Sequence, residues 1–99
     1  MSDDDHEDMT HLRVRIEGFV QAVGFRNHVI EEARRLGLDG WVRNRSDGTV
    51  EALVSGETSA VEAFVAACMK GPPGSQVKNV DLFRAEPPEE KGFHRRPSL

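Results

Sequence analysis

Cysteine and long apolar runs are scarce in this sequence, and each scarcity excludes a class of protein. Cys68 is the only cysteine among the 99 residues, so no intramolecular disulfide can form, which fits a reducing compartment and a cytoplasmic location. No apolar run approaches the roughly 20 residues that a membrane-spanning helix needs. The first residues are acidic where a signal peptide would carry a basic region and an apolar stretch, so we expect no secretory leader.

The sequence also has few aromatic residues and no large excess of basic over acidic residues. The chain has five Phe, one Trp and no Tyr, and it lacks the aromatic signature of sheets that stack RNA bases. Its formal net charge is −4, but five of the 17 acids lie within residues 1–10, and the remainder holds 12 acids against 13 bases. We therefore expect a disordered acidic tail over residues 1–10, a nearly neutral domain over residues 11–96, and no nucleic acid or membrane among the partners.

Hydrophobic periodicity predicts alternating strands and helices within one domain, which we expect to act as a monomer. The predicted strands cover residues 12–17, 40–45, 49–55 and 77–85, with residues 92–96 as a candidate short fifth strand. The predicted helices cover residues 25–36 and the stretch from Thr58 or Ser59 to Lys70. Asp47-Gly48 indicates a type I′ hairpin turn, and Ser59 with Glu62 has the spacing of a capping box.

The order β-α-β-β-α-β predicts an α+β, ferredoxin-like sandwich in which two helices cover one face of an antiparallel sheet. In that topology the first and second strands run the same way, with the third between them. Their C-terminal ends therefore share one sheet edge, roughly 10 Å apart. Arg26 follows the first strand and Asn44 ends the second, so the topology brings both to this edge.

The loop between the first strand and the first helix, residues 18–26 (GFVQAVGFR), has the composition of an anion cradle. A turn from strand to helix presents unpaired backbone N–H groups, glycine lets the main chain approach a ligand closely, and arginine offers a fork that matches phosphate oxygens. The spacing fits neither a Walker loop nor a dinucleotide-binding motif. Considered in isolation, the loop also fits a tight connection whose arginine faces solvent.

A wider pattern resembles the acylphosphatase family over nearly the whole domain, from about Leu12 to Phe93. The matching segments are residues 20–26 (VQAVGFR), 33–38 (ARRLGL), 40–44 (GWVRN), 47–51 (DGTVE) and Gly56. The resemblance implies a hydrolase that converts acyl phosphates to a carboxylate and inorganic phosphate, with no metal and no organic cofactor. A catalytically weak anion-binding module, or an RNA-binding module of the same fold, is the alternative.

The resemblance also implies the site residues. The phosphate-binding arginine falls on Arg26 and the water-positioning asparagine on Asn44. The backbone cradle falls on Gln21, Ala22, Val23, Gly24, Phe25 and Arg26. Ala22 departs from the family, which usually has glycine there, and we expect a negative φ at this residue because the rest of the signature is intact.

Other reactive side chains indicate ordinary structural roles. The four histidines show no metal-ligand spacing, and with the single cysteine they form no convincing zinc set. Cys68 lies on the apolar stripe of the second predicted helix, so we expect it in the core.

Overall fold

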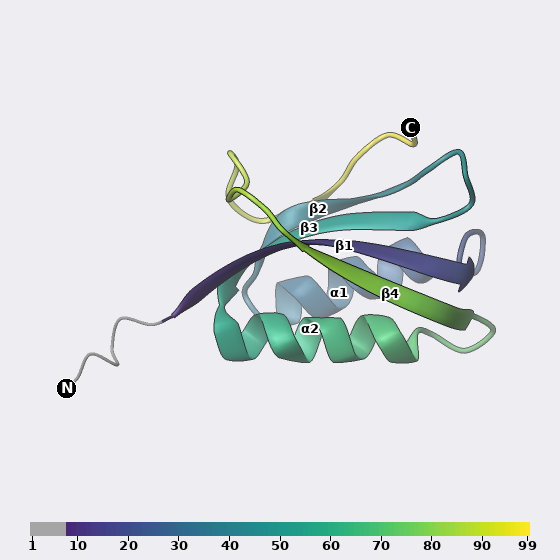
Figure 1. Ribbon diagram of the computed structural model, residues 1–99, viewed down its shortest axis with the longest axis horizontal. Helices are drawn as coiled ribbons and strands as arrows, with labels where there is room; N and C mark the ends of the chain where they lie inside the picture. Colours follow the sequence, from purple (N-terminus) through teal and green to yellow (C-terminus); the bar gives the residue numbers. More distant parts are fainter. Residues whose placement is uncertain (1–7) are drawn as a thin grey trace.

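The computed structural model describes residues 8–99 and contains the predicted order of elements. In chain order they are β1 (Met9–Phe19), α1 (Phe25–Arg35), β2 (Asp39–Asn44), β3 (Val50–Glu57), α2 (Thr58–Lys70), β4 (Gln76–Arg84) and β5 (Phe93–Arg95). The strands form one sheet in the order β4-β1-β3-β2-β5, and both helices lie against the same face of it (Figure 1). The predicted ferredoxin-like fold is confirmed.

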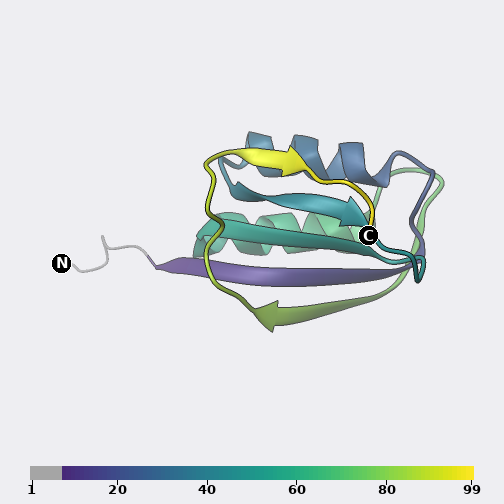
Figure 2. The same ribbon diagram turned by 90° about the horizontal axis from the view of Figure 1, so that it is seen from above.

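The fifth strand makes the sheet mixed rather than purely antiparallel. β5 pairs with β2 in the parallel direction, whereas the pairs β1–β3, β1–β4 and β2–β3 are antiparallel. Seen from above, β5 is the yellow edge strand beside β2 (Figure 2). It runs in the same direction as β2, so its last residue lies toward the end of the sheet where β2 ends.

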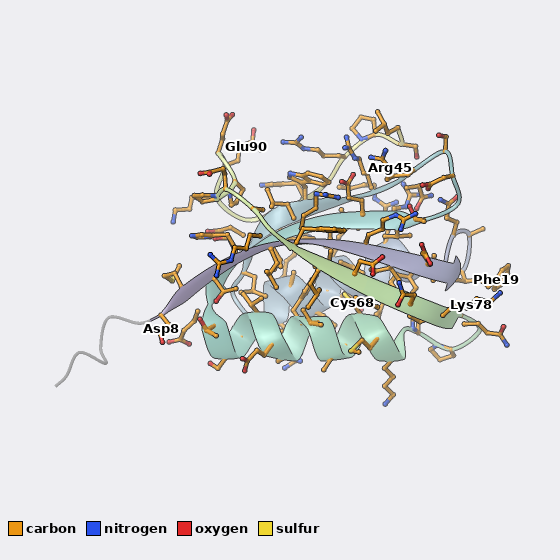
Figure 3. All side chains as sticks on the ribbon, viewed as in Figure 1. Asp8, Phe19, Arg45, Cys68, Lys78 and Glu90 are labelled. Carbon is orange, nitrogen blue, oxygen red and sulfur yellow. The ribbon has the colours of Figure 1, made fainter. Side chains whose placement is uncertain are left out.

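The core fills the space between the sheet and the two helices. Alternate residues of the central strands point toward the helices and are buried, as period-two alternation predicts. Phe64 of α2 and Phe93 of β5 lie with their ring centroids 5.9 Å apart, so β5 is packed into the core despite its edge position. Cys68 is fully buried in the same cluster, as expected (Figure 3).

The first strand is longer than predicted. β1 begins at Met9, and Met9 and Thr10 pair with Glu57 and Gly56 of β3. These two residues therefore belong to the sheet and not to the acidic tail, of which residues 1–7 lie outside the described residues. No helix within residues 8–99 is long and apolar enough to cross a membrane.

Two local predictions were wrong. Type I′ geometry needs positive φ at both central residues, and in this turn only Gly48 has it, while the Asp47 carboxylate accepts hydrogen bonds from the Thr49 backbone N–H and hydroxyl. The capping box does not form, because β3 runs directly into α2 and the N-cap residue is Glu57, with no side-chain cap bond. The Thr58 hydroxyl instead donates to the Asp8 carbonyl.

Candidate active site

The ends of β1 and β2 meet at one end of the sheet, as the topology predicts. Figure 3 labels Phe19 and Arg45, which mark these two ends, on the same side of the molecule. A cavity of about 210 Å³ lies there. Its lining residues are Val20, Ala22, Gly24, Phe25, Arg26, Asn27, Asn44 and Arg95.

The loop that leads into α1 turns its backbone toward this cavity. Ala22 and Gly24 both have left-handed backbone conformations, with φ of 63° and 75°. Such residues within a turn create concave groups of N–H donors that bind anions. Gly24 is also the N-cap of α1; it provides no side-chain cap, and the first turn contains no acidic residue. The first N–H groups of the helix are thus left for a ligand, at the positive end of the helix dipole.

The negative φ predicted for Ala22 was wrong. With φ of 63° this residue is the one non-glycine in the left-handed region within residues 8–99. The left-handed conformation costs an L-residue roughly 1–2 kcal/mol, because Cβ approaches the following carbonyl oxygen. The loop therefore stores strain where it lines the cavity, a common feature of functional sites.

We expect Ala22→Gly to increase the free energy of unfolding by about 0.5–1 kcal/mol. Glycine removes the Cβ clash, and its greater freedom in the unfolded chain offsets only part of that gain. Urea denaturation of the two proteins measures the difference. Gly24→Ala is the matched control: it introduces a Cβ at the other left-handed loop position, where nothing lies within 4 Å, and should lower stability through backbone strain alone. If Ala22→Gly were less stable than the wild type, the conclusion that Ala22 is strained would be wrong.

Gln21 belongs to the predicted cradle but has a different role in the structure. Its side-chain amide donates to the carbonyl oxygens of Arg45 and Thr49, at 2.9 and 2.8 Å. These two residues pair across the β2–β3 turn, where Arg45 N donates to Thr49 O. Gln21 therefore attaches the loop to the turn that follows Asn44. This attachment fixes the position of the loop relative to the end of β2, and both line the cavity.

Arg26 lies in the first turn of α1 and lines the cavity. Partial burial and the positive charge of Arg95 both lower the pKa of the Arg26 guanidinium. No carboxylate of the described residues forms an ion pair with either arginine. Two uncompensated cations therefore face one small cavity, which favours an anionic ligand.

The arginines on the open face of the sheet instead have a carboxylate partner. Arg13, Arg43 and Arg45 converge on the buried carboxylate of Glu51, with the shortest contact 2.8 Å from Arg43 Nε to Glu51 Oε1. Burial raises the pKa of Glu51, but the hydrogen bonds from Arg43 and Arg45 outweigh it, and the net pKa lies below its usual value. This ionised carboxylate offsets part of the charge of the three arginines, whereas Arg26 and Arg95 at the cavity have no carboxylate partner among the described residues.

Asn44 ends β2, lines the cavity and contains a buried polar atom with no partner among the described residues. Its Oδ1 is buried and accepts no hydrogen bond from the described residues. A buried acceptor without a partner costs roughly 1–3 kcal/mol. Buried acceptors in proteins are rarely left unpaired, so this atom calls for a partner such as a water molecule or a ligand.

The common nucleophiles and bases are absent from the lining of this cavity. Burial, reinforced by the negative charge of Glu32, raises the pKa of the Cys68 thiol to about 12, so it is not a nucleophile near neutral pH. His28 packs its ring edge-on against Phe25, and its Nε2 lies 3.3 Å from the Ala67 carbonyl oxygen, which directs it to α2.

Most of the predicted site residues gather here, and the structure adds others. Ala22, Gly24, Phe25, Arg26 and Asn44 line the cavity; Val23 packs against the core and Gln21 against the turn. The sequence reasoning missed Arg95 and Asn27. The spacing of the motifs contains no sign of Arg95, because only the parallel pairing of β5 with β2 brings it to this end of the sheet.

Comparison with known proteins supports the same assignment. The acylphosphatase family profile matches residues 12–95. This chain belongs to the acylphosphatase family. The acylphosphatase of Rhodospirillum rubrum is 50% identical over 91 residues, which are 92% of this chain and all of that protein. Both the predicted family and the predicted activity, enzymatic hydrolysis of acyl phosphates, are thereby confirmed.

Solved structures of the family have the same fold. An acylphosphatase from Coxiella burnetii superimposes with a TM-score of 0.85 at 32% identity, covering 97% of this chain and all of that one. The acylphosphatase from Bacillus subtilis gives a TM-score of 0.83 at 37% identity, covering 90% of this chain and 99% of that one. The fold of this chain is thus the fold of the solved acylphosphatases.

Proposed function

We propose that Arg26 and the amides of the loop from Gln21 to Arg26 hold the phosphoryl group of the substrate, and that Asn44 orients the attacking water. The observation that carries this assignment is that one cavity is lined by an arginine without a carboxylate partner and by Asn44, whose buried amide oxygen has no hydrogen-bond donor among the described residues. The arginine and the backbone N–H groups match the equatorial oxygens of phosphate. Asn44 Oδ1 accepts one hydrogen bond from the water and directs its lone pair at phosphorus.

The chemistry needs few protein groups. Water attacks phosphorus in line, a new P–O bond forms, and the bond from phosphorus to the acyl oxygen breaks. The leaving group is a carboxylate whose parent acid has a pKa of about 4, so it leaves without a general acid. Arg26 and the amides stabilise the charge on the equatorial oxygens, and positioning supplies most of the remaining rate. The phosphoryl oxygens take the proton of the water, which explains why a cavity without histidine suffices.

We also propose that the enzyme works as a cytoplasmic monomer on a small-molecule acyl phosphate. The cavity volume lies below the roughly 300–1,000 Å³ typical of drug-sized ligands, which favours a small substrate. Nucleic acid is disfavoured because the chain has no strong basic excess: outside residues 1–10 it holds 12 acids against 13 bases. The reducing environment of the cytoplasm suits a single buried thiol.

Release of phosphate from acetyl phosphate and benzoyl phosphate in the presence of EDTA tests the proposal. We expect turnover at an undiminished rate, because within residues 8–99 no three His, Cys, Asp or Glu side chains gather as they would around a metal ion. Loss of activity with EDTA and recovery with Mg²⁺ would contradict the proposal. Tight phosphate binding with no turnover would instead favour the weak anion-binding module.

A further inference from the structure

Arg95 lines the same cavity as Arg26, although it belongs to the last strand of the chain and Arg26 to the first helix. α1 packs against β5, and the two elements lie side by side (Figure 2). Near the end of α1, Arg34 Nε and Nη2 donate to the Phe93 carbonyl oxygen at 3.2 and 2.9 Å. At the start of α1, the Arg95 guanidinium donates to the side-chain oxygen of Asn27. Arg95 is therefore held beside the first turn of α1, where the loop from β1 ends.

The two arginines of the cavity are close enough to affect each other's charge. The pKa of the Arg26 guanidinium is lowered mainly by partial burial and further by the positive charge of Arg95. Within residues 8–99, neither side chain forms an ion pair with a carboxylate. Asn27 is a neutral acceptor, and a guanidinium has five N–H donors, so its bond to Asn27 leaves Arg95 with donors for a ligand. An anion bound between the arginines would relieve their repulsion.

One phosphoryl group is enough to balance both arginines. A phosphate with a single substituent carries a charge of about −1.5 to −2 near pH 7 and has three strong acceptor oxygens. Arg26 and the first N–H groups of α1 approach the cavity from the helix, whereas Arg95 approaches it from β5. Donors on two sides of one cavity suit a group whose acceptors are spread around a single phosphorus atom, and charged donors make the stronger hydrogen bonds.

We propose that Arg95 is a second phosphoryl-binding residue, which contacts the same phosphoryl group as Arg26, and that Asn27 is the positioning residue that holds it there. This inference rests on the proposed function, because the group that Arg95 binds is the one held by Arg26 and the loop. The second arginine also makes the site selective for charge. Each arginine interacts twice as strongly with a dianion as with a monoanion at the same distance, so two arginines favour the dianionic phosphoryl group.

Titration calorimetry of Arg95→Gln with inorganic phosphate tests the proposal. Glutamine keeps an N–H donor for Asn27 but removes the charge. We expect the Kd of phosphate to rise about tenfold, which corresponds to about 1.4 kcal/mol, and kcat/KM for acetyl phosphate to fall by a similar factor. Arg96→Gln is the matched control: it removes the next positive charge along the chain, but Arg96 stacks on Trp41, 4.8 Å from the ring centroid, and does not line the cavity. The control should leave both values unchanged. Equal losses in the two variants, or no loss in Arg95→Gln, would overturn the proposal.

The charge of the ligand separates phosphoryl binding from a structural role of Arg95. The ratio of the Kd of Arg95→Gln to that of the wild type should be larger above the second pKa of phosphate than below it, since the protein groups that titrate are common to both proteins. Asn27→Ala, which removes the link to α1 but keeps both arginines, should weaken phosphate binding less than Arg95→Gln does. If Arg95 only held the start of α1, the ratio would be the same at both pH values and the two variants would lose affinity equally. Either result would overturn the proposal.

Arg26→Ala distinguishes a failure of this inference from a failure of the proposed function. If Arg26→Ala weakens phosphate binding and Arg95→Gln does not, the proposed function stands and only this inference fails. If Arg26→Ala binds phosphate as tightly as the wild type while Arg95→Gln loses affinity, the proposed role of Arg26 is wrong and Arg95 remains a phosphate-binding residue.

Discussion

Arg26→Ala is expected to lower kcat/KM for acetyl phosphate by at least about 10³-fold, the scale that single arginines reach in phosphoryl transfer. The side chain lies in the first turn of α1, lines the cavity and has no carboxylate partner among the described residues. Removing it leaves the loop amides and Arg95 as the remaining sources of positive potential at the cavity. Inhibition by inorganic phosphate should weaken along with turnover. Steady-state kinetics with phosphate as a competitor measure both.

Arg26→Lys should recover little of this loss. Lysine restores the charge but not the planar fork that can contact two phosphate oxygens at once. Arg35→Ala is the matched control, because Arg35 belongs to the last turn of the same helix and pairs with Glu32 at 2.7 Å, away from the cavity. The control should keep near-native rates. A lysine variant with a near-native rate would exclude the two-point contact and leave Arg26 as a source of charge alone.

The meeting of Arg26 and Asn44 was predictable from the sequence for a physical reason. Strand and helix periods are local signals, and the order of elements left one common topology, in which the ends of the first two strands share a sheet edge. The structure places both residues in one cavity at that edge. Local patterning together with topology was therefore enough to bring the two residues to one edge, whereas their roles were implied by the resemblance to the family.

The conformation of Ala22 and the contribution of Arg95 could not be obtained in the same way. The prediction for Ala22 assumed that the loop would avoid strain, but Gln21 ties the loop to the β2–β3 turn and this attachment accompanies a left-handed conformation at the next residue. Arg95 reaches the cavity through pairing between strands far apart in sequence. Such long-range pairing follows from the assembled core, in which Phe93 packs against Phe64, and no spacing within the motifs encodes it.

Asn44→Ala is the second variant with a large expected effect, and its signature differs from that of Arg26→Ala. If Asn44 positions the water, kcat should fall by about 10²–10³-fold, the usual cost of losing one directed hydrogen bond in a transition state. Inhibition by phosphate should change only a few-fold, because the binding groups remain. The same assays, performed at saturating acetyl phosphate, separate the two effects.

If Asn44 had only a structural role, its replacement by alanine would lower the free energy of unfolding and leave kcat largely unchanged. Its Oδ1 is buried and makes no hydrogen bond with the described residues, so truncation to alanine removes an unsatisfied acceptor and should not lower the free energy of unfolding by more than about 1 kcal/mol. Asn79→Ala is the matched control, since Asn79 lies on β4 and donates to Asp81 on the surface. It should retain full kcat. An Asn44→Ala protein that loses phosphate binding but keeps kcat would place Asn44 among the phosphate-binding groups, and the water would then need another partner.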